Sequence, residues 1–259
     1  MNLLASYRYQ MIDHKKALLI FYAVMVVLSL CLGGLTAFLQ AGVLLNDDLI
    51  RINGPEAPTL LFLFIVGLCT FKENFLMSLQ NGISRKTLFT AKMLTMATVA
   101  VIAAAADSLL YLLTKVLSYL TGFAYVVTPM YKSLYGGQDT GTVLSIFLQA
   151  FLEIVMALAV MAAGYFLTVL FYRLNKVGKV AVSVGVPSLF LFVLPFCDIF
   201  FFHGKYLALM NQIIYYITHR PGFLVGCALL CFAVCSVFSY LLMRRAEAVS
   251  YTHLTLPTN

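Results

Sequence analysis

Two acidic side chains lie in parts of the sequence that are otherwise apolar. Asp107 follows the run "IAAAA", and Glu153 lies within "AFLEIV". Each stands ten residues from the expected outer end of its apolar segment, so both are expected at a similar depth. A charge in the hydrocarbon of a membrane costs at least about 2.5–3.5 kcal/mol, and such a group therefore faces protein or water, or becomes neutral. The pair is a candidate contact for a cation, a proton or a substrate, or for hydrogen bonds between helices.

Sequence motifs for phosphate binding or metal catalysis are absent. The chain has no G-x-x-x-x-G-K-[ST] loop, so it cannot bind ATP in that way, and it has no H-E-x-x-H motif. Its four histidines, His14, His203, His219 and His253, do not cluster in the sequence. We therefore expect a non-catalytic chain that itself binds no cofactor and no metal ion.

The stretch "QNGISRK" interrupts the apolar sequence with turn-forming residues and cations. Gly82 suits the left-handed residue that ends a helix, and Ser84 suits the cap that begins the next one. Arg85 and Lys86 then fall in the first turn of a helix, where the helix dipole disfavours cations. Either anionic lipid headgroups or an acidic surface on a partner protein must favour them. The expected contact element comprises Asn81, Gly82, Ile83, Ser84, Arg85 and Lys86.

The composition indicates which elements hold these residues. Of the 259 residues, 62% are hydrophobic and 10% are charged, and the mean hydropathy is +0.95. A soluble domain carries about 25% charged residues, so lipid must be the main solvent of this chain. The net charge of +7 comes from cations at the ends of apolar runs, without interleaved aromatic residues. That pattern excludes nucleic acid as the expected partner.

Six apolar segments are long enough to cross about 30 Å of hydrocarbon. They are Ala17–Phe38, Thr59–Leu79, Met93–Leu117, Val143–Phe171, Val180–Phe202 and Phe223–Met243. The second is expected to form one long helix whose inner half, "KENFLMSLQ", leaves the hydrocarbon. Residues 1–16 suit a separate helix in the headgroup region, and the spacing of Leu207, Met210, Ile214 and Ile217 predicts a short outer helix between spans five and six. The expected fold is all-α, with one transmembrane domain over residues 1–248.

Two of these spans contain residues at which a helix can break or bend. Gly33 and Gly34 lie in the first span, and Pro187 and Pro195 lie in the fifth. Such breaks line pathways in transporters, but glycine and proline also occur as ordinary kinks in membrane helices.

The cations are distributed unequally between the two expected membrane sides. With the N-terminus inside, twelve of the 17 lie on the inner side and five on the outer side. The inner set is Arg8, Lys15, Lys16, Lys72, Arg85, Lys86, Lys92, Arg173, Lys176, Lys179, Arg244 and Arg245; the outer set is Arg51, Lys115, Lys132, Lys205 and Arg220. Inner loops carry the excess of cations, so both termini are expected in the cytoplasm. Glu56 is expected in the first outer loop.

The last eleven residues are treated separately. The string "VSYTHLTLPT", Val249 to Thr258, resembles the conceptual translation of a transposon-end adaptor used in sequencing libraries. We therefore expect residues 249–259 to be read-through sequence rather than part of the native domain.

The whole arrangement resembles the type-two ABC exporter permeases, especially the compact six-span subunits of bacterial antibiotic and peptide exporters. The likeness covers nearly the whole chain in topology. At the level of sequence it covers the segment "FKENFLMSLQNGISRKTLF", Phe71 to Phe89, since many members carry a similar N-G-x-S-R-K turn. The resemblance implies that this turn contacts a separate ATPase subunit, which binds the ATP. It also implies a second permease chain, identical or different, membrane lipids as partners, and a place in the bacterial cytoplasmic membrane.

Two other functions fit the same sequence. A stand-alone ion- or proton-coupled carrier would use Asp107 and Glu153 as its active groups. A membrane immunity or accessory protein would transport nothing. Co-purification separates the first of these from a permease, because a carrier works without an ATPase.

Overall fold

The computed structural model of the chain describes residues 3–41, 50–121, 125–136, 142–202 and 204–244. Within this part of the chain, six helical segments are long and apolar enough to cross a membrane. The all-α, six-span architecture predicted from the sequence is therefore confirmed. The sequence did not predict the two four-residue strands, β1 (Ile50–Asn53) and β2 (Tyr125–Thr128), which pair in parallel. The tail expected to be read-through sequence lies outside the described residues.

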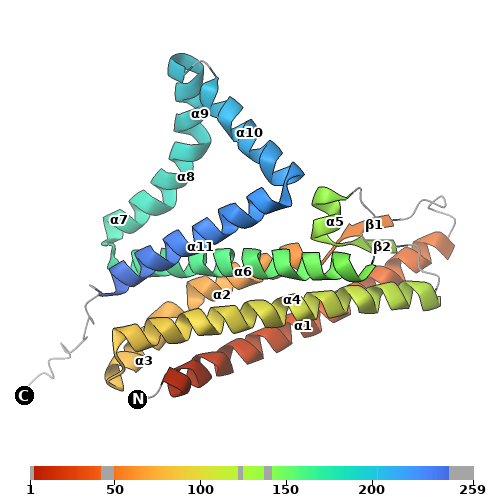
Figure 1. Ribbon diagram of the computed structural model, residues 1–259, viewed down its shortest axis with the longest axis horizontal. Coiled ribbons are helices and arrows are strands. Elements are labelled where there is room, and N and C mark those ends of the chain that lie inside the picture. Colours follow the sequence, from red (N-terminus) through yellow and green to blue (C-terminus); the bar gives the residue numbers. More distant parts are fainter. Residues whose placement is uncertain (1–2, 42–49, 122–124, 137–141, 203, 245–259) are drawn as a thin grey trace, which may run out of the picture.

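A central helix organises the bundle (Figure 1). The long helices are α1 (Leu3–Ala41), α2 (Glu56–Cys69), α3 (Phe71–Gln80), α4 (Arg85–Thr121), α6 (Thr142–Arg173) and α11 (Pro221–Arg244). Helix α6 packs against α2, α4 and α11, whereas α1 packs against α4. The start of α1, the α3–α4 corner and the end of α11 lie at one end of the bundle, with β1, β2 and α5 (Met130–Tyr135) at the other.

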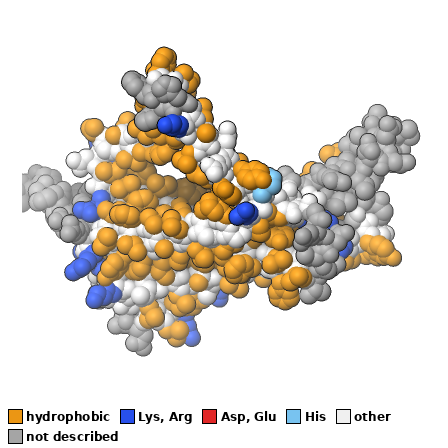
Figure 2. All heavy atoms as spheres, turned by 45° about the horizontal axis from the view of Figure 1, so that its top comes forward, with side chains coloured by type: hydrophobic (Ala, Val, Ile, Leu, Met, Phe, Trp, Pro, Cys, Tyr) orange, Lys and Arg blue, Asp and Glu red, His pale blue; other side chains and the backbone are white. Residues whose placement is uncertain are grey.

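The end that holds the α3–α4 corner is called the basic end, because Arg8, Arg85, Lys86, Arg173 and Arg244 belong to the helix ends that meet there. Figure 2 shows Lys and Arg side chains gathered at this end, at the left, while hydrophobic side chains cover most of the visible bundle. Such a surface suits a bundle whose long sides face lipid.

Helix α1 is one continuous helix from Leu3. Residues 3–16, expected to form a helix in the headgroup region, are therefore helical but continuous with the first span. The cause is local, since residues 3–16 contain no glycine or proline to end a helix. Met11 and Leu18 also enter the same hydrophobic core. Gly33 and Gly34 likewise lie inside α1 without interrupting it.

The second span consists of two helices rather than one. Helix α2 ends at Cys69 and α3 begins at Phe71, with Thr70 between them. The Asn74 amide donates to the Thr70 carbonyl oxygen at 2.9 Å, and the Lys92 ammonium donates to the Thr70 hydroxyl at 2.7 Å. Side-chain donors thus bind Thr70 at the break, and such competition with the helix ladder is a known cause of helix bends. The expected single long helix is corrected to a helix pair.

The fifth span remains helical across both of its prolines. It runs through α7 (Lys176–Val180), α8 (Val186–Ser188) and α9 (Leu194–Cys197), separated and followed by π-helical turns at Ala181–Gly185, Leu189–Val193 and Asp198–Phe202. Proline removes an N–H donor and crowds the carbonyl four residues earlier, and a wider turn accommodates both effects. The most apolar stretch of Lys176–Phe200 has no buried residue, and these helices stand away from the bundle in Figure 1.

Asp198 fixes the sharp turn into α10 (Lys205–His219), which confirms the short helix predicted between spans five and six. Its two carboxylate oxygens accept the backbone N–H groups of Tyr206 at 2.8 Å and Leu207 at 3.0 Å. Gly204 takes the left-handed conformation, with φ of 81°, that this reversal requires. The carboxylate satisfies first-turn donors that a helix start leaves unpaired.

Helices α2 and α6 approach each other closely at two glycines. A methyl group on Gly67 would lie 2.6 Å from the Met161 carbonyl oxygen, and one on Gly164 would lie 2.5 Å from the Phe64 carbonyl oxygen. The Thr168 hydroxyl also donates to the Leu68 carbonyl oxygen of α2 at 2.6 Å. Small residues that let two backbones meet are the usual means of helix association in membranes.

Candidate functional site

The α3–α4 corner has the conformation predicted from its sequence. Gly82 has a φ of 67°, and its N–H donates to the Leu79 carbonyl oxygen at 3.1 Å. The Ile83 N–H donates to the Ser78 carbonyl oxygen at 2.9 Å, which completes the paired bonds of a glycine-terminated helix end. The Ile83 side chain is buried, so the corner is also anchored by apolar packing.

Ser84 caps the helix that follows the corner. Its hydroxyl accepts the Thr87 backbone N–H at 3.2 Å and lies 2.8 Å from the Thr87 hydroxyl. The left-handed glycine and the serine cap are therefore both confirmed. One helix ends and the next begins within a few residues, and hydrogen bonds hold the chain between them.

The two cations of the corner differ in their surroundings. The Arg85 guanidinium donates to the carbonyl oxygen of Arg244, at the end of α11. Carbonyl groups at a helix C-terminus attract cations, so α11 explains why a cation at the start of α4 is tolerated. Lys86 is exposed, as is Asn81, whose amide donates to the Met77 carbonyl oxygen at 2.8 Å. Within the corner, Lys86 is thus the cation available to another molecule.

The structure brings Asp107 and Glu153 together inside the bundle. Asp107 comes from α4 and Glu153 from α6, and both are buried. The two carboxyl groups lie side by side. The Thr59 hydroxyl of α2 donates to Asp107 Oδ1 at 3.0 Å, and the nearby Tyr22 hydroxyl of α1 donates to the Ala103 carbonyl oxygen at 3.0 Å. Four helices therefore meet at this pair.

A third carboxyl group extends this cluster. Glu56, the first residue of α2, is 1% exposed. Its Oε1 accepts hydrogen bonds from the Gln149 amide of α6 and, at 3.3 Å, from the Met130 backbone N–H. Glu56 is thus buried at the end of a helix, and its expected place in an outer loop is corrected.

Several oxygens of the three acids lack a partner. Among the described residues, no hydroxyl, amide or other donor group bonds Oε2 of Glu56, Oδ2 of Asp107 or either carboxyl oxygen of Glu153, so Asp107 and Glu153 have only each other at these atoms. No grouping of side chains suited to a metal ion occurs in the described part of the chain. The arrangement can hold protons, or accept hydrogen bonds from a ligand with N–H groups, because its free atoms are acceptors until they are protonated.

A second buried polar group lies nearer the basic end. The Lys92 side chain is 3% exposed, and it is one of the cations that the sequence analysis counted on the inner side. Its ammonium bonds the Thr70 hydroxyl at 2.7 Å, lies 3.2 Å from His14 Nε2 and stands 5.7 Å from the centre of the Tyr165 ring. This lysine ties α4 to α1, to the α2–α3 break and to α6.

Sequence reasoning missed Glu56, Gln149 and Lys92 as buried groups. Gln149 precedes Glu153 by one helical turn, so spacing alone could have placed it beside the acids. Glu56 and Lys92 carried no such signal. The local sequence of a charged residue next to an apolar run is the same whether the side chain faces water or protein.

A comparison of the chain with protein families, with curated proteins and with solved structures finds no match.

Proposed function

We propose that the chain is the membrane permease subunit of an ABC exporter, and that its α3–α4 corner binds a separate ATPase subunit. ATP is bound and hydrolysed on that subunit, in keeping with the lack of a phosphate-binding loop in this sequence. In this proposal the basic end faces the cytoplasm of a bacterial cell, because inner loops carry the excess of cations.

The observation that carries the proposal is the fixed shape of the corner. Hydrogen bonds at Gly82, Ile83 and Ser84 hold the chain in one conformation. Attraction to lipid headgroups needs positive charge but no defined shape. A preorganised corner that presents the exposed Lys86 is what docking into an acidic protein groove requires, since little conformational freedom is then lost on binding.

A second permease chain, identical or different, completes the proposed complex. The fifth span supports this part of the proposal, because the described residues of the chain bury none of the side chains in its most apolar stretch. Val177 is 81% exposed and Phe192 is 71% exposed. A neighbouring permease chain would cover such a helix along with lipid.

The test is pull-down of a co-expressed cassette ATPase with the tagged permease. Lys86→Glu and Gly82→Val should each lower ATPase recovery about tenfold at matched permease abundance, because a reversed charge or a misshapen corner costs at least about 1.4 kcal/mol of binding. Lys179→Glu is the control, since Lys179 is an exposed cation on α7, outside the corner. Undiminished recovery with both variants would make the corner an ordinary basic loop.

The three buried acids favour a second candidate, a stand-alone ion- or proton-coupled carrier. In that case Asp107 and Glu153 are the coupling groups, and transport requires no ATPase. Purified chain in proteoliposomes with an imposed proton gradient distinguishes the two functions. Gradient-driven uptake that Asp107→Asn abolishes would favour the carrier, whereas transport only after addition of the ATPase subunit and ATP would favour the permease.

A further inference from the structure

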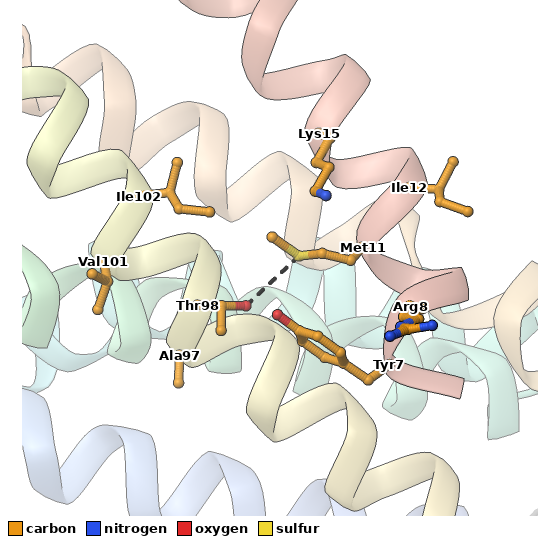
Figure 3. A pocket seen from close by; sticks show the side chains of 9 residues that line it. All are labelled: Tyr7, Arg8, Met11, Ile12, Lys15, Ala97, Thr98, Val101 and Ile102. Carbon is orange, nitrogen blue, oxygen red and sulfur yellow. Dashed lines mark hydrogen bonds between the residues drawn. The ribbon is translucent and has the colours of Figure 1, made fainter. Parts of the chain in front are cut away.

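A groove of about 800 Å³ lies between α1 and α4, and it belongs to neither of the sites above. Figure 3 shows Tyr7 and Met11 of α1 directed toward Thr98 of α4 at the base of this groove. The lining residues are Tyr7, Arg8, Met11, Ile12 and Lys15 from α1, and Ala97, Thr98, Val101 and Ile102 from α4.

The positive charge of the groove comes from one face of α1. Arg8 and Lys15 are separated by two helical turns and so lie on the same side of the helix. Both are exposed, and none of the described residues lining the groove is acidic. The neighbouring Asp13 does not line it. Two cations without an acidic partner in the groove suit an anionic group.

The remaining walls are mostly apolar. Ile12 is 54% exposed, Val101 53% and Ile102 42%, so these side chains are open to a ligand. The Thr98 hydroxyl is already directed to the Met11 sulfur at 3.6 Å. Few polar groups of the groove are therefore left to bind a ligand. A soluble anion such as inorganic phosphate would gain nothing from these apolar walls.

The two kinds of wall are ordered along the helices. Lys15 precedes the long apolar run of α1 that begins at Ala17, whereas Val101 and Ile102 lie well inside the apolar part of α4. The cations therefore stand at the level of lipid headgroups, and the apolar walls continue toward the membrane interior.

We propose that this groove binds an anionic phospholipid. Its phosphate lies between Arg8 and Lys15, and one acyl chain packs along Val101 and Ile102 of α4. Charge complementarity selects the headgroup, and the open apolar walls select a ligand with a chain. This binding goes beyond the proposed function, because it requires only that the helices span a membrane and not that an ATPase docks.

The test is native mass spectrometry of the delipidated protein in detergent, titrated with dioleoyl phosphatidylglycerol or dioleoyl phosphatidylcholine. We expect tighter binding of the anionic lipid, and about thirty-fold weaker binding of it in the double variant Arg8→Gln/Lys15→Gln. Lys16→Gln/Lys72→Gln is the matched control, since it removes two exposed cations outside the groove and should leave the affinity nearly unchanged.

Two further arms identify the ligand and guard against misfolding. Ala97→Phe fills the groove without changing its charge and should also weaken phosphatidylglycerol binding, whereas Arg8→Lys/Lys15→Arg keeps the charge and should preserve it. Glycerol 3-phosphate should compete at least a hundred-fold less well than the lipid. Equal binding of both lipids, unchanged binding in the double variant, or effective competition by glycerol 3-phosphate would each overturn the proposal.

Discussion

Asp107, Glu153 and Glu56 are buried together, and few hydrogen-bond donors offset the cost of removing their carboxyl groups from water. Several of their carboxyl oxygens have no hydrogen-bond partner among the described residues. A buried polar atom without a partner costs about 1–3 kcal/mol, so these side chains do not stabilise the bundle by hydrogen bonding through those atoms. Residues that lower stability in this way are frequent at functional sites.

At the residue scale, this predicts opposite behaviour for two neighbouring substitutions. Glu153→Gln should leave the unfolding temperature unchanged or raise it, because the new amide can donate a hydrogen bond to the neighbouring Asp107 carboxyl group and removes one buried acid. Thr59→Val should destabilise the protein by about 1–3 kcal/mol, because Asp107 Oδ1 loses its donor. Thermal unfolding in detergent measures both. A loss of stability in Glu153→Gln as large as that in Thr59→Val would show that the Glu153 carboxyl makes a stabilising contact.

Two of the three acids in this cluster could be predicted from the sequence. Asp107 and Glu153 were recognisable because an acidic residue inside an apolar run must contact protein or water, or become neutral. Glu56 was not, because its burial depends on Met130 and Gln149, which the folded chain brings to it from distant segments. Where a charge borders a span, tertiary packing decides its exposure.

At the scale of elements, the α2–α6 contact depends on the absence of side chains at two positions. Gly164→Ala should destabilise the protein by about 1–3 kcal/mol, because the added methyl group overlaps the Phe64 carbonyl oxygen and forces the helices apart. Gly226→Ala is the matched control within α11, since among the described residues nothing beyond the helix's own nearby backbone lies within 4 Å of its added methyl group. That change should stabilise the helix slightly, by about 0.4–1 kcal/mol. Equal unfolding temperatures for the two variants would contradict the close contact.

The sequence predicted where helices exist better than where they are continuous. Apolar runs located all six spans, since their length reflects the thickness of the hydrocarbon. The bend at Thr70 and the π-helical turns of the fifth span were beyond such reasoning. The first depends on the side chains of Asn74 and Lys92, and the second on how the chain accommodates Pro187 and Pro195.

At the scale of the whole molecule, the distribution of cations predicts the orientation. A membrane-impermeant maleimide should modify Ser133→Cys in intact cells but not Asn81→Cys, in a background without the native cysteines. Both side chains are exposed, and they lie at opposite ends of the bundle. Both variants should react after the cells are lysed, which controls for accessibility. Labelling of Asn81→Cys alone in intact cells would reverse the orientation inferred from the cations.

The parallel pairing of β1 with β2 also bears on the order in which the chain is assembled. Ile50 pairs with Tyr125 and Asn53 with Thr128, and the chain between the strands forms α2, α3 and α4. Strand β1 therefore leaves the ribosome long before its partner and keeps unpaired backbone groups until α4 has crossed back. The two short strands can therefore pair only after the chain between them, which forms α2, α3 and α4 and so the second and third spans, has been made.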